Sequence, residues 1–265
     1  MALRIMLTSR QPIWVGWGQD LIYFYNDPYK SIIGGKHPWA LGRPTKEVWR
    51  EIWPEIGPML ATAMSGDAGT YVEAQLLIME RNGYPEETYY TFSYSPIPND
   101  DGTVGGIICA NSDDTQRVIG ERQLALLRDL AAGATHTRTW QEACERSAEA
   151  LSTNARDIPF SMIYLEEPDS AVMKLAGVSG IERGAAIAAE EMSPEASAPW
   201  PFMEVLRTHQ LAIVADLQNT VGAELPSGPW SAAPTHAAVI PLSPPGETGR
   251  AGVLIVGLNP FRLFD

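Results

Sequence analysis

The first half of the chain alternates between the hydrophobic periods of strands and of helices. Short aromatic runs at Ile13–Trp17 and Leu21–Tyr25 predict two paired strands. Asn26 then offers a cap to the free N–H groups of a helix, and Pro28 suits its first turn. Four apolar residues between positions 45 and 64 share one helical face: Trp49, Ile52, Trp53 and Ile56. Two prolines in this stretch predict a kink or two short helices.

Three more strands are predicted to close this half of the chain. They are expected at Ala74–Glu80, Glu87–Ile97 and Thr103–Ala110. Asn82 and Gly83 form a strong hairpin signal between the first two. Three aromatic residues of the middle strand alternate with polar ones and so share one face: Tyr90, Phe92 and Tyr94. Five strands, with helices inserted after the second, form an α+β plan.

A helix is expected over residues 114–135, and a second α+β half follows it. Thr139 and Glu142 have the spacing of a capping box, in which each side chain accepts from the other residue's backbone N–H. The helix that follows is expected to bury Trp140 and Cys144 on one face. Strands are expected at 159–165, 172–178, 212–217, 236–242 and 252–258, and a short helix at 201–210. The stretches 182–199 and 218–235 are expected to be loops.

Composition limits the partners that this chain can have. Its 265 residues are 45% hydrophobic, which suits about two folded domains. The formal net charge of -13 repels phosphate backbones, so we expect no nucleic acid partner. No run of about 18 apolar residues is present, so we expect no membrane insertion and a cytoplasmic location.

The sequence contains no recognisable catalytic or metal-binding set, so we expect no enzyme activity in this chain. Cys109 and Cys144 have neither disulfide-framework nor zinc spacing and are expected to be small core residues. His37 lies in a loop rich in Pro and Gly, and His136 lies in a linker, where we expect it to be exposed. No glycine-rich loop is followed by the Lys-Ser/Thr of a P-loop.

Several strings of the first half resemble the PAS domain of bacterial sensor histidine kinases. The strings lie at residues 12–18, 25–29, 36–42, 48–56 and 80–97. The resemblance implies a five-stranded antiparallel sheet with helices on one face. Asp113 and Thr115, with Arg117 and Glu121, match the short motif that ends such a domain and ties its core to the outgoing helix. The family has an aliphatic residue where this chain has Asp114.

The second half resembles a GAF domain, an antiparallel sheet flanked by helices. The matching strings lie at residues 162–165, 176–180, 238–242 and 251–258. The family adds a helix after the last strand, so the resemblance implies a GAF domain that lacks this helix and a kinase module downstream. The expected organisation is a PAS domain over 1–115, a connecting helix over 116–138 and the GAF domain over 139–265.

Aromatic residues of the PAS-like half suggest a small-molecule pocket. Trp and Tyr suit such a site, because each combines a large apolar face with one polar tip. The candidate lining residues are Trp14, Tyr25, Trp39, Trp49, Trp53, Tyr90 and Phe92. A filled core without a ligand remains the other interpretation. The chain lacks the histidine or cysteine patterns by which relatives hold haem, flavin or bilin, so none of these cofactors is expected.

These features predict a sensory input module. A small molecule or partner would act on the PAS-like half, and the helix after Asp113 and Thr115 would relay the change. By resemblance we expect a homodimer that signals to the kinase module. The alternative is a scaffold with packed cores that serves dimerisation alone.

Overall fold

The computed structural model describes residues 1–66, 68–134, 137–167, 170, 172–193, 199–242 and 250–264. His136, the end of the expected connecting helix and part of the loop expected over 182–199 lie outside these residues. The chain divides into two compact units, which we call unit 1 (Met1–Gly120) and unit 2 (Glu121–Leu263). The helix α5 (Thr115–Ala134) belongs to both. Among the described helices, none combines the length and the apolar character that a membrane crossing requires.

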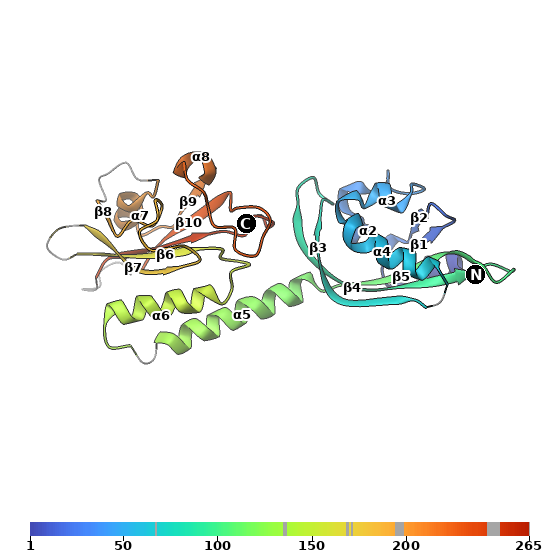
Figure 1. The fold of residues 1–265 in the computed structure, drawn as a ribbon, viewed down its shortest axis with the longest axis horizontal. Coiled ribbons are helices and arrows are strands. Elements are labelled where there is room, and N and C mark those ends of the chain that lie inside the picture. Colours follow the sequence, from blue (N-terminus) through green and yellow to red (C-terminus); the bar gives the residue numbers. More distant parts are fainter. Residues whose placement is uncertain are drawn as a thin grey trace. The chain divides into compact units, whose positions relative to one another are not determined.

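Unit 1 contains a five-stranded antiparallel sheet in the order β2-β1-β5-β4-β3. Its strands are β1 (Ile13–Trp17), β2 (Ile22–Tyr25), β3 (Thr70–Met79), β4 (Glu86–Pro98) and β5 (Val104–Asp113). Helical segments between β2 and β3 cover one face of this sheet (Figure 1). They are η1 (Asp27–Tyr29), α2 (Lys30–Ile33), η2 (Gly34–Lys36), α3 (Thr45–Val48), η3 (Arg50–Ile52) and α4 (Trp53–Met64). The predicted α+β plan and the break between short helices are confirmed.

The buried side chain of Asn26 fixes the start of this helical cover. Its Oδ1 accepts from the backbone N–H of Ile13, at 3.1 Å, and of Tyr29, at 3.3 Å. Its Nδ2 donates to the carbonyls of Met6 and Gln11. The predicted cap is therefore confirmed, and the same amide also joins β1 to the segment before it.

A short helix before β1, α1 (Ala2–Thr8), is absent from the sequence prediction. It packs Met6 against Ile13 and Val15. Seven residues make fewer than two turns, which is too short for helical periodicity to appear in the sequence.

Unit 2 contains a six-stranded antiparallel sheet in the order β8-β7-β6-β11-β10-β9. Its strands are β6 (Ser161–Glu166), β7 (Met173–Ser179), β8 (Glu191–Met192), β9 (Ala212–Ala215), β10 (His236–Pro241) and β11 (Gly252–Gly257). The helix α6 (Trp140–Ser152) packs on β6 and β7, and α7 (Phe202–Thr208) packs on β10 and β11 (Figure 1). The expected loops were wrong in part, because β8 and α8 (Leu217–Val221) form within or beside them. β8 has two residues and α8 has five, which is too few for a hydrophobic period to show in the sequence.

The predicted burial of Trp140 on α6 was wrong, since this side chain is 58% exposed. The helix buries Cys144, Ala148 and Leu151 instead. A Cβ added to Gly177 of β7 would lie 2.5 Å from the carbonyl oxygen of Cys144, so helix and strand approach too closely for a large side chain between them. Small residues therefore face the sheet, and the indole lies outside.

The cap of α6 gives a first testable prediction. Thr139 Oγ1 accepts from the N–H of Glu142 at 3.1 Å, as predicted, but the Glu142 carboxylate accepts from Arg138 N–H rather than from Thr139. We expect Thr139→Ala to lower the free energy of unfolding of unit 2 by about 1 kcal/mol. Urea unfolding followed by the Ile163 methyl signal measures this loss.

The matched control is Glu149→Ala, which removes an exposed side chain from the same helix without touching the cap. Equal unfolding midpoints for the Thr139 and Glu149 variants would show that the cap contributes nothing.

Candidate functional site

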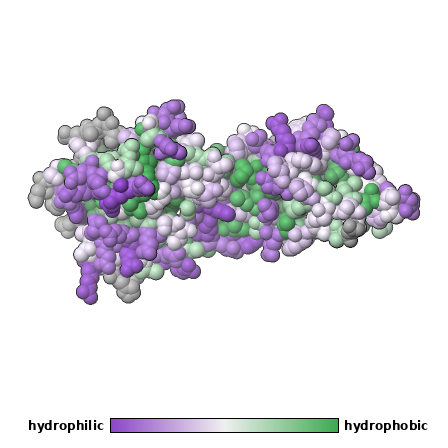
Figure 2. Space-filling model, viewed as in Figure 1, coloured by the Kyte–Doolittle hydropathy of each residue, from purple (hydrophilic) through white to green (hydrophobic). Residues whose placement is uncertain are grey.

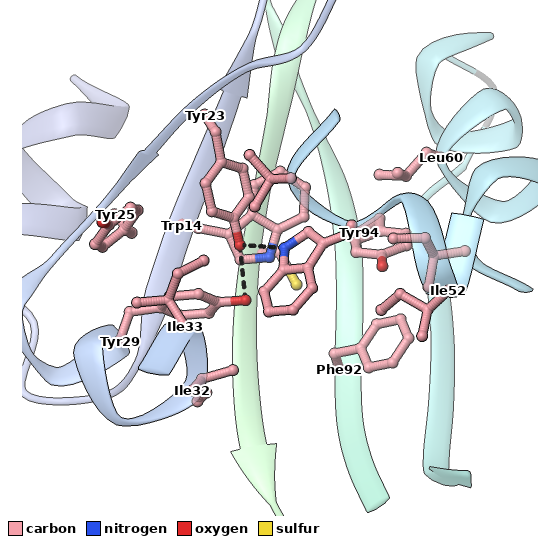
Figure 3. Packing of buried hydrophobic residues seen from close by; sticks show 14 of the residues in the cluster. Trp14, Tyr23, Tyr25, Tyr29, Ile32, Ile33, Ile52, Leu60, Phe92 and Tyr94 are labelled. Atoms are coloured by element: carbon pink, nitrogen blue, oxygen red, sulfur yellow. Dashed lines mark hydrogen bonds between the residues drawn. The ribbon is translucent and has the colours of Figure 1, made fainter. Parts of the chain in front are cut away.

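The buried centre of unit 1 is a cluster of aromatic side chains from four segments (Figure 3). Trp14 comes from β1, Tyr23 and Tyr25 from β2, Tyr29 from η1, and the rings of β4 face them. The predicted alternation on β4 is confirmed, because Tyr90, Phe92 and Tyr94 are all less than 5% exposed. Across β5, the register pairs them with Asp113, Asn111 and Cys109 in that order. The same face of the sheet therefore carries three aromatic rings and three polar side chains.

A cavity lies inside this cluster, with about 30 Å³ in which the centre of a water-sized molecule can move. Its walls come from the sheet and from the helical cover. They are formed by Trp14, Tyr29, Ile32, Trp49, Ile52, Ile56, Leu77, Met79, Tyr90, Phe92, Tyr94 and Asn111. Such a space holds about two water molecules or an organic molecule of a few heavy atoms.

The structure brings together four of the seven predicted lining residues: Trp14, Trp49, Tyr90 and Phe92. Tyr25 is buried in the cluster but does not line the cavity, and its hydroxyl lies 2.8 Å from His37 Nδ1. Trp53 packs against the cluster while partly buried, and Trp39 is 47% exposed. Treating every tryptophan as buried ignores that its indole tolerates a water-facing position. Ligand contact by any of the seven stays a prediction.

Three lining residues with polar tips were missing from the predicted lining set, Tyr29, Tyr94 and Asn111, although Tyr94 was predicted to share a strand face with Tyr90 and Phe92. Tyr29 lies directly after the Asn26 cap, so the cap was a usable signal for it. Asn111 follows Cys109 by two positions on β5 and so shares its face. The alternation of side chains between the two faces of β5 was therefore the signal that could have identified Asn111.

Hydrogen bonds link the polar tips inside the cluster. The indole N–H of Trp49 donates to the Tyr23 hydroxyl at 3.0 Å, and that hydroxyl donates to Tyr29 at 2.7 Å (Figure 3). Burial raises the pKa of Tyr23 and Tyr29 well above the ordinary value, and it does the same for Tyr94. All three hydroxyls therefore keep their protons at neutral pH.

Both cysteines are buried, as predicted. Burial raises the pKa of the Cys109 and Cys144 thiols, so little of either is thiolate. We expect both thiols in the native chain to react with a disulfide reagent at pH 8 at least about 100-fold more slowly than in denaturant, because the thiolate is the nucleophile. Rapid labelling of either cysteine in the folded chain would contradict this burial.

A second set of contacts joins the cavity wall to the start of α5. The Tyr90 hydroxyl accepts from Arg81 at 2.8 Å and donates to Asp113 Oδ2 at 3.1 Å. Asp113 Oδ1 accepts from the backbone N–H of Thr115 at 3.0 Å. Arg81 is also held by Glu86 Oε2 at 3.0 Å. One carboxylate thus touches both a cavity residue and the first residue of the helix.

Thr115 and Asp114 tie the same helix to β4. Thr115 Oγ1 accepts from the N–H of Tyr89 at 3.0 Å. Asp114 Oδ2 accepts from the Thr91 hydroxyl, and its Oδ1 pairs with Arg117 at 3.2 Å. Asp114 was set aside as a departure from the family pattern, but here it anchors α5 as well. Glu121 lies exposed, further along α5.

Unit 2 has an open groove of its own, of about 650 Å³. Residues 180–182, 185–187 and 223–227 line it, with the glutamates Glu182 and Glu224 among small and apolar side chains. No group of three His, Cys, Asp or Glu side chains in the described part of the chain is arranged to hold a metal ion.

No family model matches the sequence, and no curated protein matches it. Among solved structures, the chain is similar to the GAF domain of a phosphoenolpyruvate-protein phosphotransferase from Acinetobacter, at 13% identity and a TM-score of 0.40, over 54% of this chain and 81% of that one. A PAS domain from Colwellia psychrerythraea is 16% identical, with a TM-score of 0.34, over 43% of this chain and 95% of that one. A sensory box sensor histidine kinase from Vibrio cholerae is 15% identical, with a TM-score of 0.31, over 42% of this chain and 83% of that one.

These likenesses concern the fold alone. The strand orders and helices of the two units themselves confirm the predicted α+β plan. Unit 1 has the five-stranded antiparallel sheet with a helical cover on one face, and unit 2 has the antiparallel sheet flanked by helices.

Proposed function

We propose that this chain is the sensory input module of a signalling protein. In this proposal a small molecule enters the cavity of unit 1, and the start of α5 receives the change. The carrying observation is that Tyr90 lines the cavity with its side chain and binds Asp113, whose second oxygen accepts from Thr115 N–H. PAS and GAF folds are sensory signalling modules that are typically not catalytic.

In this proposal, the hydrogen bonds between Tyr90, Arg81 and Asp113 make the start of α5 respond to a ligand in the cavity. Arg81 contacts the Tyr90 hydroxyl and Glu86, and it lies 3.8 Å from Asp113. Any shift of the Tyr90 ring changes the distances from Arg81 to the Glu86 and Asp113 carboxylates, and so the strength of the two ion pairs. A ligand moves this equilibrium only as far as it binds one arrangement better than the other. In this proposal the sensory module passes its signal to a kinase module downstream. The sensory module acts as a homodimer in the cytoplasm.

The relay is tested by Asp113→Ala. The carboxylate accepts from the first N–H of α5 and lies at the positive end of the helix dipole. We expect hydrogen exchange to become about 5- to 10-fold faster from Val118 to Leu126, because a lost helix cap costs about 1 kcal/mol. This span reaches from unit 1 into unit 2.

Asp101→Ala is the matched control, because Asp101 caps only the turn between β4 and β5. A change confined to the Thr115 amide, or one equal in both variants, would count against the relay.

A second candidate function is a dimerisation scaffold without sensing. Much of the surface over α5 and α6 is hydrophilic in Figure 2, yet Leu124 and Leu127 of α5 are more than 60% exposed. On α1, Leu3, Ile5 and Leu7 are at least 50% exposed. Ligand-dependent melting separates the two functions, since only a molecule that binds the native state raises the unfolding temperature.

A further inference from the structure

We propose that the cavity of unit 1 accepts a small, neutral molecule that supplies hydrogen-bond acceptors, such as a carbonyl compound of a few heavy atoms. This inference rests on the proposed sensory function and names the chemistry of its ligand. It follows from a surplus of donors around a cavity whose wall contains no charged side chain.

The first surplus donor is the amide of Asn111. Asn111 lines the cavity, and its Nδ2 is one of two buried side-chain polar atoms that have no hydrogen-bond partner within the described residues. Its Oδ1 is already engaged, since the Cys109 thiol lies 3.6 Å away and donates to it. Buried polar groups nearly always have partners, so an unpaired amide at a cavity wall points to a missing acceptor.

The second surplus donor comes from the linked hydroxyls of Tyr23 and Tyr29. Two hydroxyls carry two protons, but the single bond between them uses only one. The other contact, from Trp49 Nε1, brings in a further donor and no acceptor. One hydroxyl proton therefore has no acceptor among the described residues, and the direction of the Tyr23 bond places it on Tyr29, which lines the cavity.

Tyr94 supplies a third donor. Its ring lines the cavity, it is 3% exposed, and no described group accepts from its hydroxyl. Its raised pKa arises from burial first, and then from the nearness of Cys109 and Tyr29. Tyr94 and Tyr29 thus present their protons to the same interior, and Figure 3 shows both rings within the one cluster.

The side chains that line the cavity also determine which net charge the ligand can have. No Lys, Arg or His lines the cavity, and Arg81 is held outside it by Glu86 and the Tyr90 hydroxyl. A buried anion would lack a counter-charge and would cost too much to desolvate. A buried cation would also lack a counter-charge, because no Asp or Glu lines the cavity. The guest is therefore neutral, rich in acceptors and no larger than a few heavy atoms.

Three probes of nearly one shape test this chemistry on the full chain. Acetone is neutral with an acceptor, isobutene is neutral without one, and acetate is charged. We expect acetone to give a saturable NMR shift of the Asn111 side-chain amide, with at least about 10-fold weaker binding of isobutene and acetate. Equal or tighter binding of isobutene or acetate overturns the inference, and so does the absence of any saturable shift, which would leave water as the only guest.

Two variants test the donors directly, and isobutene binding or the methyl spectrum shows that each variant is still folded. Tyr94→Phe removes one donor and almost no volume, and we expect about 5-fold weaker acetone binding with isobutene unchanged. Asn111→Leu, confirmed as folded by its methyl spectrum, should reverse the preference in favour of isobutene. Unchanged acetone affinity in both variants overturns the inference.

Exchange at α5 separates this inference from the proposed function. Acetone binding that leaves α5 exchange unchanged supports the ligand chemistry and defeats the relay. Isobutene binding that is at least as tight as acetone binding and that changes α5 exchange supports the relay and overturns the ligand chemistry.

Discussion

Replacing Lys36 with methionine is expected to lower the free energy of unfolding of unit 1 by about 3–5 kcal/mol. The Lys36 ammonium is buried between three groups: the Glu51 carboxylate, the Val48 carbonyl at 2.7 Å and the Trp49 ring at 4.2 Å. The pair is only 10% and 11% exposed, so removing the cation leaves a buried carboxylate without a counter-charge. Burial already lowers the pKa of Lys36, and Glu51 opposes that shift.

Urea unfolding followed by the Ile107 methyl signal, from the core of unit 1, measures this loss. Lys36→Met combined with Glu51→Gln should recover most of the stability, because the double variant has no unpaired Glu51 carboxylate in its core. Lys30→Met is the matched control, since Lys30 pairs with an exposed partner, and it should leave the urea midpoint unchanged. A double variant as unstable as the single one would contradict this account of the pair.

Raising the pH above about 9 to 10 is expected to destabilise unit 1 steeply. Burial raises the pKa of Tyr23, Tyr29, Tyr90 and Tyr94 and of the Cys109 thiol, so the folded chain holds protons that the unfolded chain releases between about pH 8.5 and 10. Above that range the folded state binds more protons, and the free energy of unfolding falls by about 1.4 kcal/mol per pH unit for each group. Five such groups give up to about 7 kcal/mol per pH unit. The lowered pKa of Lys36 has the opposite sign and offsets at most one of these protons.

The urea midpoint between pH 8 and 10.5 measures this slope, again with the Ile107 methyl as reporter. Tyr94→Phe should reduce the slope by about one fifth, since one of five titrating groups is lost. A midpoint that does not change with pH would mean that these hydroxyls reach water in the folded chain.

The sequence predicted the elements whose contacts are local or regular. The strand Ile13–Trp17 has the predicted bounds, and the period of 2 placed Tyr90, Phe92 and Tyr94 on one buried face. The Asn26 cap was also readable, because one of the two hydrogen bonds that its Oδ1 accepts comes from Tyr29, three residues later.

The rest depended on contacts between distant segments. The link from Tyr90 to Asp113 spans 23 residues, and the amide of Asn111 meets the cavity only through the register of β4 with β5. Trp140 was misplaced because the close approach of α6 to the sheet at Gly177 cannot be seen from one helix alone. The size of the cavity follows from side-chain packing, which no single-segment pattern contains.

Hydrogen exchange at the Thr115 amide, compared between Tyr90→Phe and Tyr94→Phe, tests the central claim most directly. Both variants remove one hydroxyl from a ring that lines the cavity, but only Tyr90 binds Asp113. If the cavity wall is coupled to α5 through that hydroxyl, exchange becomes about 5-fold faster in Tyr90→Phe and stays unchanged in Tyr94→Phe. Equal exchange in the two variants would contradict the coupling.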